Sequence, residues 1–377
     1  PKEGENPYAC ASDILKMWQD KGILKIEDKP AIYIYEEEFS VGNTRKSIKG
    51  IIARVQLEEF SKGIILPHEF TLSKAKEDRL NLMKATNCNF SQIYALYMDE
   101  KHTTLATIDE QSKAKADLEF TDETGVTHRL WIETDEEIIA KLVADFADRK
   151  LYIADGHHRY ETALNYRNYC RENGISKPGD PQDFQMIYLV DMEHPGLVVF
   201  PTHRLVRDLP NFDKEAVLEK CSEFFYIDEK EGTDTMEDDL KKLYDEGKKA
   251  FGFYCGKGEW FLLTLKNIDI MSQMLPDVSK ASQSLDVSVL HTLILEKIFG
   301  IDKENMAKQI NLTYTKFFTE AIDGVDKGEF QCSFVLNPTR VTEIRDVAAA
   351  GEKMPQKSTY FYPKMITGMV MNNLGVD

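Results

Sequence analysis

The sequence predicts an α+β (mixed α/β) chain. Segments rich in β-branched and aromatic residues are interspersed with segments of helical periodicity, and they form no single long βαβα series. The chain has 377 residues, of which 42% are hydrophobic and 29% charged, as is usual for a globular protein with a substantial core. At ~150 residues per domain, this length is compatible with two or three domains, or with one large domain.

The sequence pattern of the first half predicts strands interspersed with helices. Strands are expected at 31–35, 51–57, 91–98, 151–154, 185–190 and 197–200. Thr71 is expected to cap a helix through Ala85, because its side-chain oxygen can accept an N–H group at the helix start. A second helix is predicted over 135–148, where apolar residues share one stripe, and a third from about His158 to Asn173.

The second half predicts a smaller set of elements. Asp213 caps a helix, which is followed by a strand, a helix and two strands up to Leu265. An amphipathic helix with Asp286 as its cap is expected over 286–299, then a strand over 331–336 and a helix from 337 to about 351. The domains are predicted as 1–208 and 209–377, with the boundary near Asp208-Leu209-Pro210.

Composition limits the classes of function. Lys and Arg number 47 and Asp and Glu 64, so the net charge is −17, which argues against broad nucleic-acid binding. No apolar run approaches the ~20 residues that span a bilayer, so no membrane association is expected. The six cysteines are scattered and form no C-x-x-C pair, which predicts free thiols in a reducing cytoplasm.

The sharpest motif is Asp155-Gly156-His157-His158-Arg159-Tyr160. It follows an apolar strand and opens a helix, and a glycine turn before a helix N-terminus is an anion site because backbone N–H groups and the helix dipole point outward. Arg159 adds a planar fork that matches phosphate oxygens. The alternative is a capped helix start with solvated histidines. Metal binding by the two histidines is less favoured, since adjacent helix positions point apart and no third ligand is near.

A second motif is Pro67-His68-Glu69-Phe70-Thr71, with Lys76 and Arg79 downstream. Glu69, just before a helix, is a candidate general base at the edge of a positive pocket. Lys76 and Arg79 are three residues apart and share a helix face. On its own this segment also fits a charged, solvated helix face.

A third motif lies near the C-terminus, where prolines bracket the run Met354 to Lys364. A rigid extended loop is expected there, and Lys357, Ser358 and Thr359 are candidates to bind a carboxylate or phosphate. A surface turn with packed tyrosines is the alternative. Thr202-His203-Arg204 and His291 are weaker candidates, His291 being more typical of a satisfied core histidine. P-loop, Rossmann and hydrolase signatures are absent.

Together these motifs resemble a bacterial family of unknown function, numbered ten-fifteen. The matching pieces are the HE-x-T segment with its Lys and Asp-Arg, IADGHHRYETAL, FVLNPT and MPQKSTYFYPK. The DGHHR loop is also similar to that of archaeal free-serine kinases, relatives of ParB and sulfiredoxin. Those kinases carry P-H-E, D-G-H-H-R and a K-[ST]-T-like element in the same order.

The resemblance implies a ParB/sulfiredoxin-like nucleotide-binding core that carries the HE and DGHHR motifs, and a larger C-terminal α/β part whose loop returns to the site. It implies a kinase acting on a small hydroxylated metabolite, with serine or a related amino acid as the first expectation. Its site residues would be Glu69, His68 and Arg159 for catalysis, Asp155 to Arg159 for nucleotide phosphates, and Lys357, Ser358, Thr359, Lys76 and Arg79 for the substrate.

The expected cofactors are ATP or ADP, with Mg²⁺ to neutralise phosphate charge and Asp155 as its candidate ligand. A homo-oligomer is compatible with the sequence, and nucleic-acid partners are not expected. Two alternatives remain open. One is a ParB-like nucleotide sensor or interaction module without turnover, and the other is a family member that binds an anion and catalyses nothing.

Overall fold

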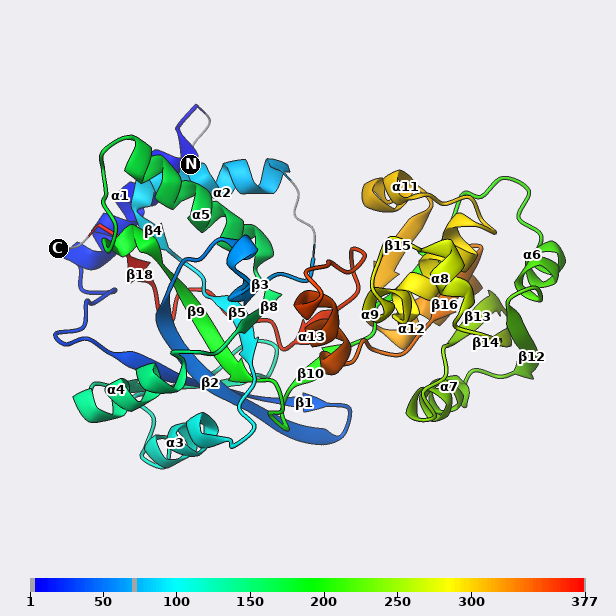
Figure 1. Ribbon diagram of the computed structural model, residues 1–377, viewed down its shortest axis with the longest axis horizontal. Helices are drawn as coiled ribbons and strands as arrows, with labels where there is room; N and C mark the ends of the chain where they lie inside the picture. Colours follow the sequence, from blue (N-terminus) through cyan, green and yellow to red (C-terminus); the bar gives the residue numbers. More distant parts are fainter. Residues whose placement is uncertain (1–3, 70–72, 376–377) are drawn as a thin grey trace. The chain divides into compact units, whose positions relative to one another are not determined.

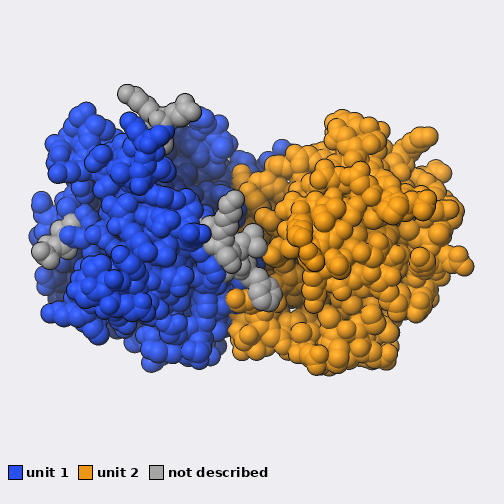
Figure 2. All heavy atoms as spheres, turned by 90° about the horizontal axis from the view of Figure 1, so that it is seen from above, with its two compact units in different colours: residues 1–198, 363–377 blue, residues 199–362 orange. Residues whose placement is uncertain are grey.

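The computed structural model describes residues 4–69 and 73–375, and its chain divides into two compact units. Unit 1 comprises residues 1–198 and 363–377, and unit 2 comprises residues 199–362 (Figure 2). Helices and several sheets are mixed within the chain, which confirms the α+β prediction (Figure 1). The predicted domains, 1–208 and 209–377, differ from these units at both ends of unit 2. The strand at 203–206 belongs to the sheet of unit 2, and residues 363–377 return to unit 1.

Unit 1 is built on an eight-stranded mixed sheet. In spatial order its strands are β3 (Ile65–Leu66), β8 (Leu151–Asp155), β5 (Ile93–Tyr97), β9 (Phe184–Asp191), β2 (Thr44–Gln56), β1 (Ile32–Val41), β7 (Thr127–Glu133) and β6 (Leu118–Thr121). Its helices are α1 (Pro7–Asp20), α2 (Ser73–Thr86), α3 (Thr103–Gln111), α4 (Glu136–Asp145) and α5 (His157–Glu172), with short 3₁₀ turns η1 (Phe60–Lys62) and η2 (Pro181–Asp183). β4 (Cys88–Asn89) pairs with β18 (Asn372–Asn373), which ties the C-terminal segment to this unit.

Helix α5 packs on one face of this sheet. Tyr160, Ala163 and Leu164 of the helix share a core with Ile93 of β5 and Ile153 of β8. Burial of such side chains is the main source of stability. Figure 1 shows α5 beside α2, and the two helices are in contact. The sheet therefore fixes the start of α5 directly after the end of β8.

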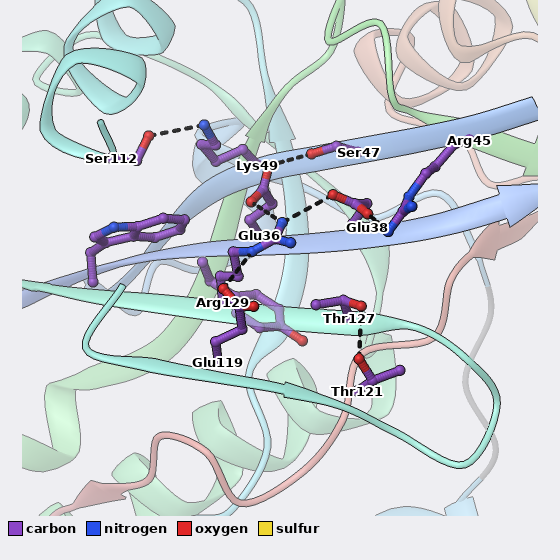
Figure 3. Close-up of polar contacts among 12 residues, drawn as sticks. Glu36, Glu38, Arg45, Ser47, Lys49, Ser112, Glu119, Thr121, Thr127 and Arg129 are labelled. Atoms are coloured by element: carbon purple, nitrogen blue, oxygen red, sulfur yellow. Dashed lines mark hydrogen bonds and ion pairs between the residues drawn. The ribbon is translucent and has the colours of Figure 1, made fainter. Parts of the chain in front are cut away.

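The β1–β2 hairpin is longer than its apolar residues predict. β1 continues through three glutamates to Val41 because neighbouring strands supply partners for the alternate carboxylates (Figure 3). Arg129 of β7 lies within 3.0 Å of Glu36 and 3.1 Å of Glu38, and its Nε donates to Glu119 at 2.9 Å. Cross-strand charge pairs of this kind support strand pairing where β propensity is poor.

Unit 2 has a six-stranded antiparallel sheet. In spatial order its strands are β12 (Phe225–Glu231), β14 (Glu259–Leu265), β13 (Ala250–Gly256), β16 (Cys332–Val335), β11 (His203–Val206) and β15 (Leu312–Thr315). Its helices are α6 (Lys214–Cys221), α7 (Met236–Asp245), α8 (Ile270–Met274), α9 (Lys280–Gln283), α10 (Asp286–Val289), α11 (Lys303–Lys308), α12 (Phe318–Asp326) and α13 (Val341–Ala349). β10 (Val198–Phe200) and β17 (Tyr360–Tyr362) form a separate two-stranded sheet.

Two helix predictions in this unit need correction. The helix expected over 286–299 is α10 followed by a π-helix, η3 (Leu290–Glu296), and Asp286 is its first residue rather than its cap. The carboxylate of Asp286 instead forms an ion pair with Lys249, whose Nζ lies 2.8 Å from its Oδ1. The last helix begins at Val341, after Arg340, whose backbone N–H donates to Glu343 at 2.9 Å.

Two further sequence predictions can be compared with the structure. All six cysteines are free thiols. Within residues 4–69 and 73–375, no helix combines the length and apolar character needed to cross a membrane. Thr71, the predicted cap of the second helix, lies outside the described residues.

Candidate functional site

The two motifs of the first half lie after neighbouring parallel strands. β3 ends at Leu66, just before Pro67-His68-Glu69, and β8 ends at Asp155, just before Gly156. The strands pair in parallel, with Leu66 opposite Tyr152. The carboxyl ends of parallel neighbours meet at one edge of a sheet, which is where ligands bind in open α/β sheets. The register therefore brings the two motifs together.

His68 fastens one motif to the other. Its ring Nδ1–H donates to the carbonyl of Ile153 at 2.6 Å, and its backbone N–H donates to His157 Nε2 at 3.2 Å. The two imidazole rings pack edge to face, with centroids 4.6 Å apart. His68 is fully buried, and this burial lowers its pKa to about 4, so the ring is neutral at pH 7. A buried neutral ring in this position supports a positioning role.

Glu69 is placed by this fastening. It follows His68 directly, consecutive Cα atoms being about 3.8 Å apart, and its side chain is half-buried. It therefore lies close to the start of α5, where a carboxylate can take a proton from a bound hydroxyl group. The hydrogen bonds of His68 explain why the His-Glu pair occurs directly after the short strand β3.

Gly156 forms the turn before α5, and Arg159 lies in the first turn of that helix. Gly156 has φ +96, and a Cβ at this position would lie 2.8 Å from Arg159 Nη2 and 3.0 Å from its Nε. The guanidinium is therefore folded back over the glycine at the helix start. Its Nε is buried and has no hydrogen-bond partner in the described part of the chain. A buried donor of this kind requires an acceptor, and the positive end of the helix dipole favours an anion there.

Asp155 and Lys364 form an ion pair next to this turn. Lys364 Nζ lies 2.7 Å from Asp155 Oδ2, and both residues belong to unit 1. Burial opposes ionisation of Asp155, but the Lys364 charge and hydrogen bond and the Arg159 charge outweigh it and lower the pKa of Asp155. The carboxylate is thus ionised at pH 7. Burial lowers the pKa of Arg159, and the negative charge of Asp155 opposes this shift.

The cations of α2 face the first turns of α5. Lys76 Nζ donates to Glu161 at 2.7 Å. Burial lowers the pKa of His158, and the positive charges of Arg79, Lys76 and Arg159 lower it further. His158 is therefore neutral at pH 7 among these cations. In a chain of net charge −17, this part of unit 1 is a local positive site.

The structure brings together the predicted site residues of unit 1. The predicted substrate residues of the C-terminal loop, 357–359, belong to unit 2. His68, Glu69, Asp155, Gly156, His157, His158, Arg159, Lys76 and Arg79 all belong to unit 1.

In unit 2, Lys357 is exposed with φ +59, and the buried Ser358 hydroxyl donates to the Pro355 carbonyl at 2.5 Å. Thr359 is half-buried beside them. That these three residues bind substrate remains a prediction.

Sequence reasoning did not assign Lys364 or Glu161 to the site. Lys364 lies 209 residues after Asp155, so no local pattern links them. Its position at the end of the proline-bracketed run was the only available signal. Glu161 is visible in the sequence only as a charged residue in the first turns of a helix, and its pairing with Lys76 depends on the packing of α2 against α5.

The described part of the chain contains no metal centre. Asp155, the predicted Mg²⁺ ligand, is paired with Lys364. Among the residues that the structure describes, no three His, Cys, Asp or Glu side chains are grouped to hold a metal ion. Mg²⁺ stays a prediction about the nucleotide-bound state.

Comparison with known families assigns the chain to one of them. The family described as "Protein of unknown function (DUF1015)" has a model that matches residues 1–288. The chain belongs to this family. The family description supplies no activity, and no curated protein matches the chain.

Solved structures resemble the DUF1015 chain at low identity. A conserved hypothetical protein from Pyrococcus furiosus is 14% identical with a TM-score of 0.40, over 86% of this chain and 95% of that one. A mutant free serine kinase in complex with ADP is 12% identical with a TM-score of 0.40, over 82% and 88%. A free serine kinase in complex with AMP is 13% identical with a TM-score of 0.41, over 82% and 86%. Similarity at this level carries no functional argument.

Proposed function

We propose that unit 1 has a ParB/sulfiredoxin-like nucleotide-binding core that holds the phosphates of ATP or ADP at the start of α5. We further propose that it transfers a phosphoryl group to a small hydroxylated metabolite, such as serine or a related amino acid. The observation that carries the proposal is the Arg159 guanidinium, folded over Gly156 with a buried Nε that lacks an acceptor among the described residues. A phosphate oxygen at the helix N-terminus supplies that acceptor.

Glu69 completes the chemistry. The acceptor hydroxyl gives its proton to the Glu69 carboxylate, and its oxygen forms a bond to the terminal phosphorus. The bond from that phosphorus to the bridging oxygen breaks, and the shortened nucleotide leaves with the electron pair. Arg159 stabilises the negative charge on the equatorial phosphoryl oxygens. His68 keeps Glu69 in place and takes no proton, because burial lowers the pKa of its ring to about 4.

Cations around the turn hold the reacting groups. Lys76 and Arg79 on α2 face His158 and Glu161 and are proposed to contact the acceptor or the outer phosphates.

The nucleotide half of the proposal is tested by titration calorimetry with ATP, ADP and AMP. Arg159→Met should weaken binding by roughly ten- to a hundredfold, since a hydrogen bond to a charged group contributes about 1.5–3 kcal/mol. The matched control is Arg171→Met at the other end of α5, where Arg171 pairs with Asp183 at 2.6 Å. The control should bind as the wild type does. Equal affinity in all three proteins would show that the start of α5 does not bind the nucleotide phosphates.

The catalytic half is tested by a product assay with hydroxyl amino acids. Glu69→Gln should lower turnover by about 10²-fold or more while nucleotide affinity stays unchanged. Glu110→Gln, on the exposed end of α3, is the matched control and should keep full turnover. If the wild type binds nucleotide but yields no phosphorylated product, the alternative of a nucleotide sensor or interaction module replaces the kinase.

A further inference from the structure

Arg204 of β11 is a buried cation without an acidic partner. Its side chain is completely shielded from solvent, at 0% exposure. Within residues 4–69 and 73–375, no carboxylate lies within ion-pair distance of it. Burial lowers its pKa only to about 10, so the group is charged at pH 7. Buried charges are costly unless they are paired, so this guanidinium requires an explanation.

The groups around Arg204 are neutral. Its Nη1 donates to the Thr202 carbonyl, and its Nη2 donates to His291 Nε2 and to the Lys357 carbonyl, both at 3.1 Å. The ring of Tyr314 lies 5.3 Å from the guanidinium carbon. The Nε atom is buried and has no hydrogen-bond partner in the part of the chain that the structure describes. Dipoles and an aromatic ring reduce the cost of the charge, but none of these groups neutralises it.

The two nearby histidines do not change this balance. Burial and the charge of Arg204 lower the pKa of His291 well below its usual value. The same two effects lower the pKa of His203 to about 4. Both rings are neutral at pH 7, so the local charge is +1. His291 also lies in η3, and π-helical turns are often found at functional sites.

We propose that unit 2 contains an oxyanion-binding site at Arg204, for the carboxylate or phosphate group of a small molecule. The anion takes the unpartnered Nε–H and displaces the Lys357 carbonyl from Nη2, which gives the paired geometry that guanidinium groups form with oxyanions. Entry is through the loop 355–358, whose residue Lys357 is exposed and holds φ +59, a conformation that lysine rarely adopts. The proposal concerns unit 2 alone and does not depend on the proposed function of unit 1.

The site is tested with the full chain carrying Arg159→Met, so that the phosphate site proposed for unit 1 does not contribute. Inorganic phosphate, acetate and L-serine are titrated while the arginine Nε–H signals are followed by ¹⁵N NMR. One signal, identified by its absence in Arg204→Lys, should shift downfield and saturate. Saturation with acetate and L-serine but not phosphate assigns a carboxylate site, and the reverse result assigns a phosphate site.

Arg204→Lys keeps the charge but loses the planar guanidinium, so titration calorimetry with the same anions should show a dissociation constant raised at least tenfold. The matched control is Arg345→Lys on α13, where Arg345 is partly exposed and pairs with Asp346. It should bind as its parent does. If Arg204→Lys does not fold, the spectra of the parent still decide, because a buried Nε–H that gains an acceptor must shift. The absence of any saturating Nε–H shift with all three probes would overturn the proposal.

Discussion

His68 shows how one residue connects sequence, geometry and stability. The sequence marked it as a catalytic candidate beside Glu69. The structure buries the ring completely and uses both its Nδ1–H and its backbone N–H to fasten the loop to β8 and α5. The residue type was recognisable from the motif, but its burial was not, because burial depends on the packing of β3 against β8.

Burial of His68 predicts a loss of stability in acid. The unfolded chain takes up a proton near pH 6.5, whereas folded His68, with its pKa lowered to about 4, does not. Stability from this residue is therefore complete above pH 6.5 and is lost as pH falls from 6.5 towards 4. The shift corresponds to about 3 kcal/mol at most.

Urea unfolding between pH 4 and 7 measures this effect. His68→Asn keeps a donor for the Ile153 carbonyl but cannot titrate, so its free energy of unfolding should fall less steeply with acid than that of the wild type. His203 and His291 contribute slopes of the same sign in both proteins. Equal slopes in the wild type and His68→Asn would show that His68 is not a buried neutral group.

At the scale of elements, predictions succeeded where the determining contacts are local. The buried run before Asp155, the glycine turn and the helix that follows are all encoded within a few residues, and β8 and α5 are found there. Predictions were incomplete where distant strands decide. The sequence predicts that β1 ends near Tyr35, before the glutamates. Arg129 lies 91 to 93 residues away from the carboxylates with which it pairs, so no local pattern reveals this partner.

The turn before α5 gives a prediction with a matched control. Gly156→Ala should lower stability by about 1–2 kcal/mol, because an L-residue is strained at φ +96. The new Cβ would also push the Arg159 guanidinium aside, so affinity for nucleotide phosphates should fall. Gly174→Ala, just beyond the other end of α5, is strained at φ +66 but meets nothing within 4 Å.

Chemical denaturation and nucleotide titration separate the two effects. Both alanine variants should lose stability, and only Gly156→Ala should lose affinity. If the two variants bind nucleotide equally well, the position of Arg159 over Gly156 is irrelevant to binding.

At the scale of the whole chain, unit 2 is an insertion between two parts of unit 1. Residues 199–362 have their own antiparallel sheet and their own core, which includes Trp260, Leu240 and Val335. The chain enters through β10 and leaves through β17, and these strands are hydrogen-bonded to each other. The ends of the insertion are therefore adjacent. The predicted domains placed all of residues 209–377 in the second domain, with a C-terminal loop that returns to the site. The assignment of residues 363–377 to unit 1 was not predicted, because it rests on long-range contacts such as Asn372 with Asn89.

Adjacent ends and a separate core predict that residues 198–362 fold without the rest of the chain. The isolated segment should give one cooperative urea transition and a circular dichroism spectrum of a mixed α/β protein. It should also keep the oxyanion response of Arg204, because the hydrogen-bond partners of this side chain among the described residues, and the ring of Tyr314, lie between Thr202 and Lys357. A segment of the same fold that no longer responds would mean that unit 1 is required for that site, whereas an unfolded segment would contradict the independence of unit 2.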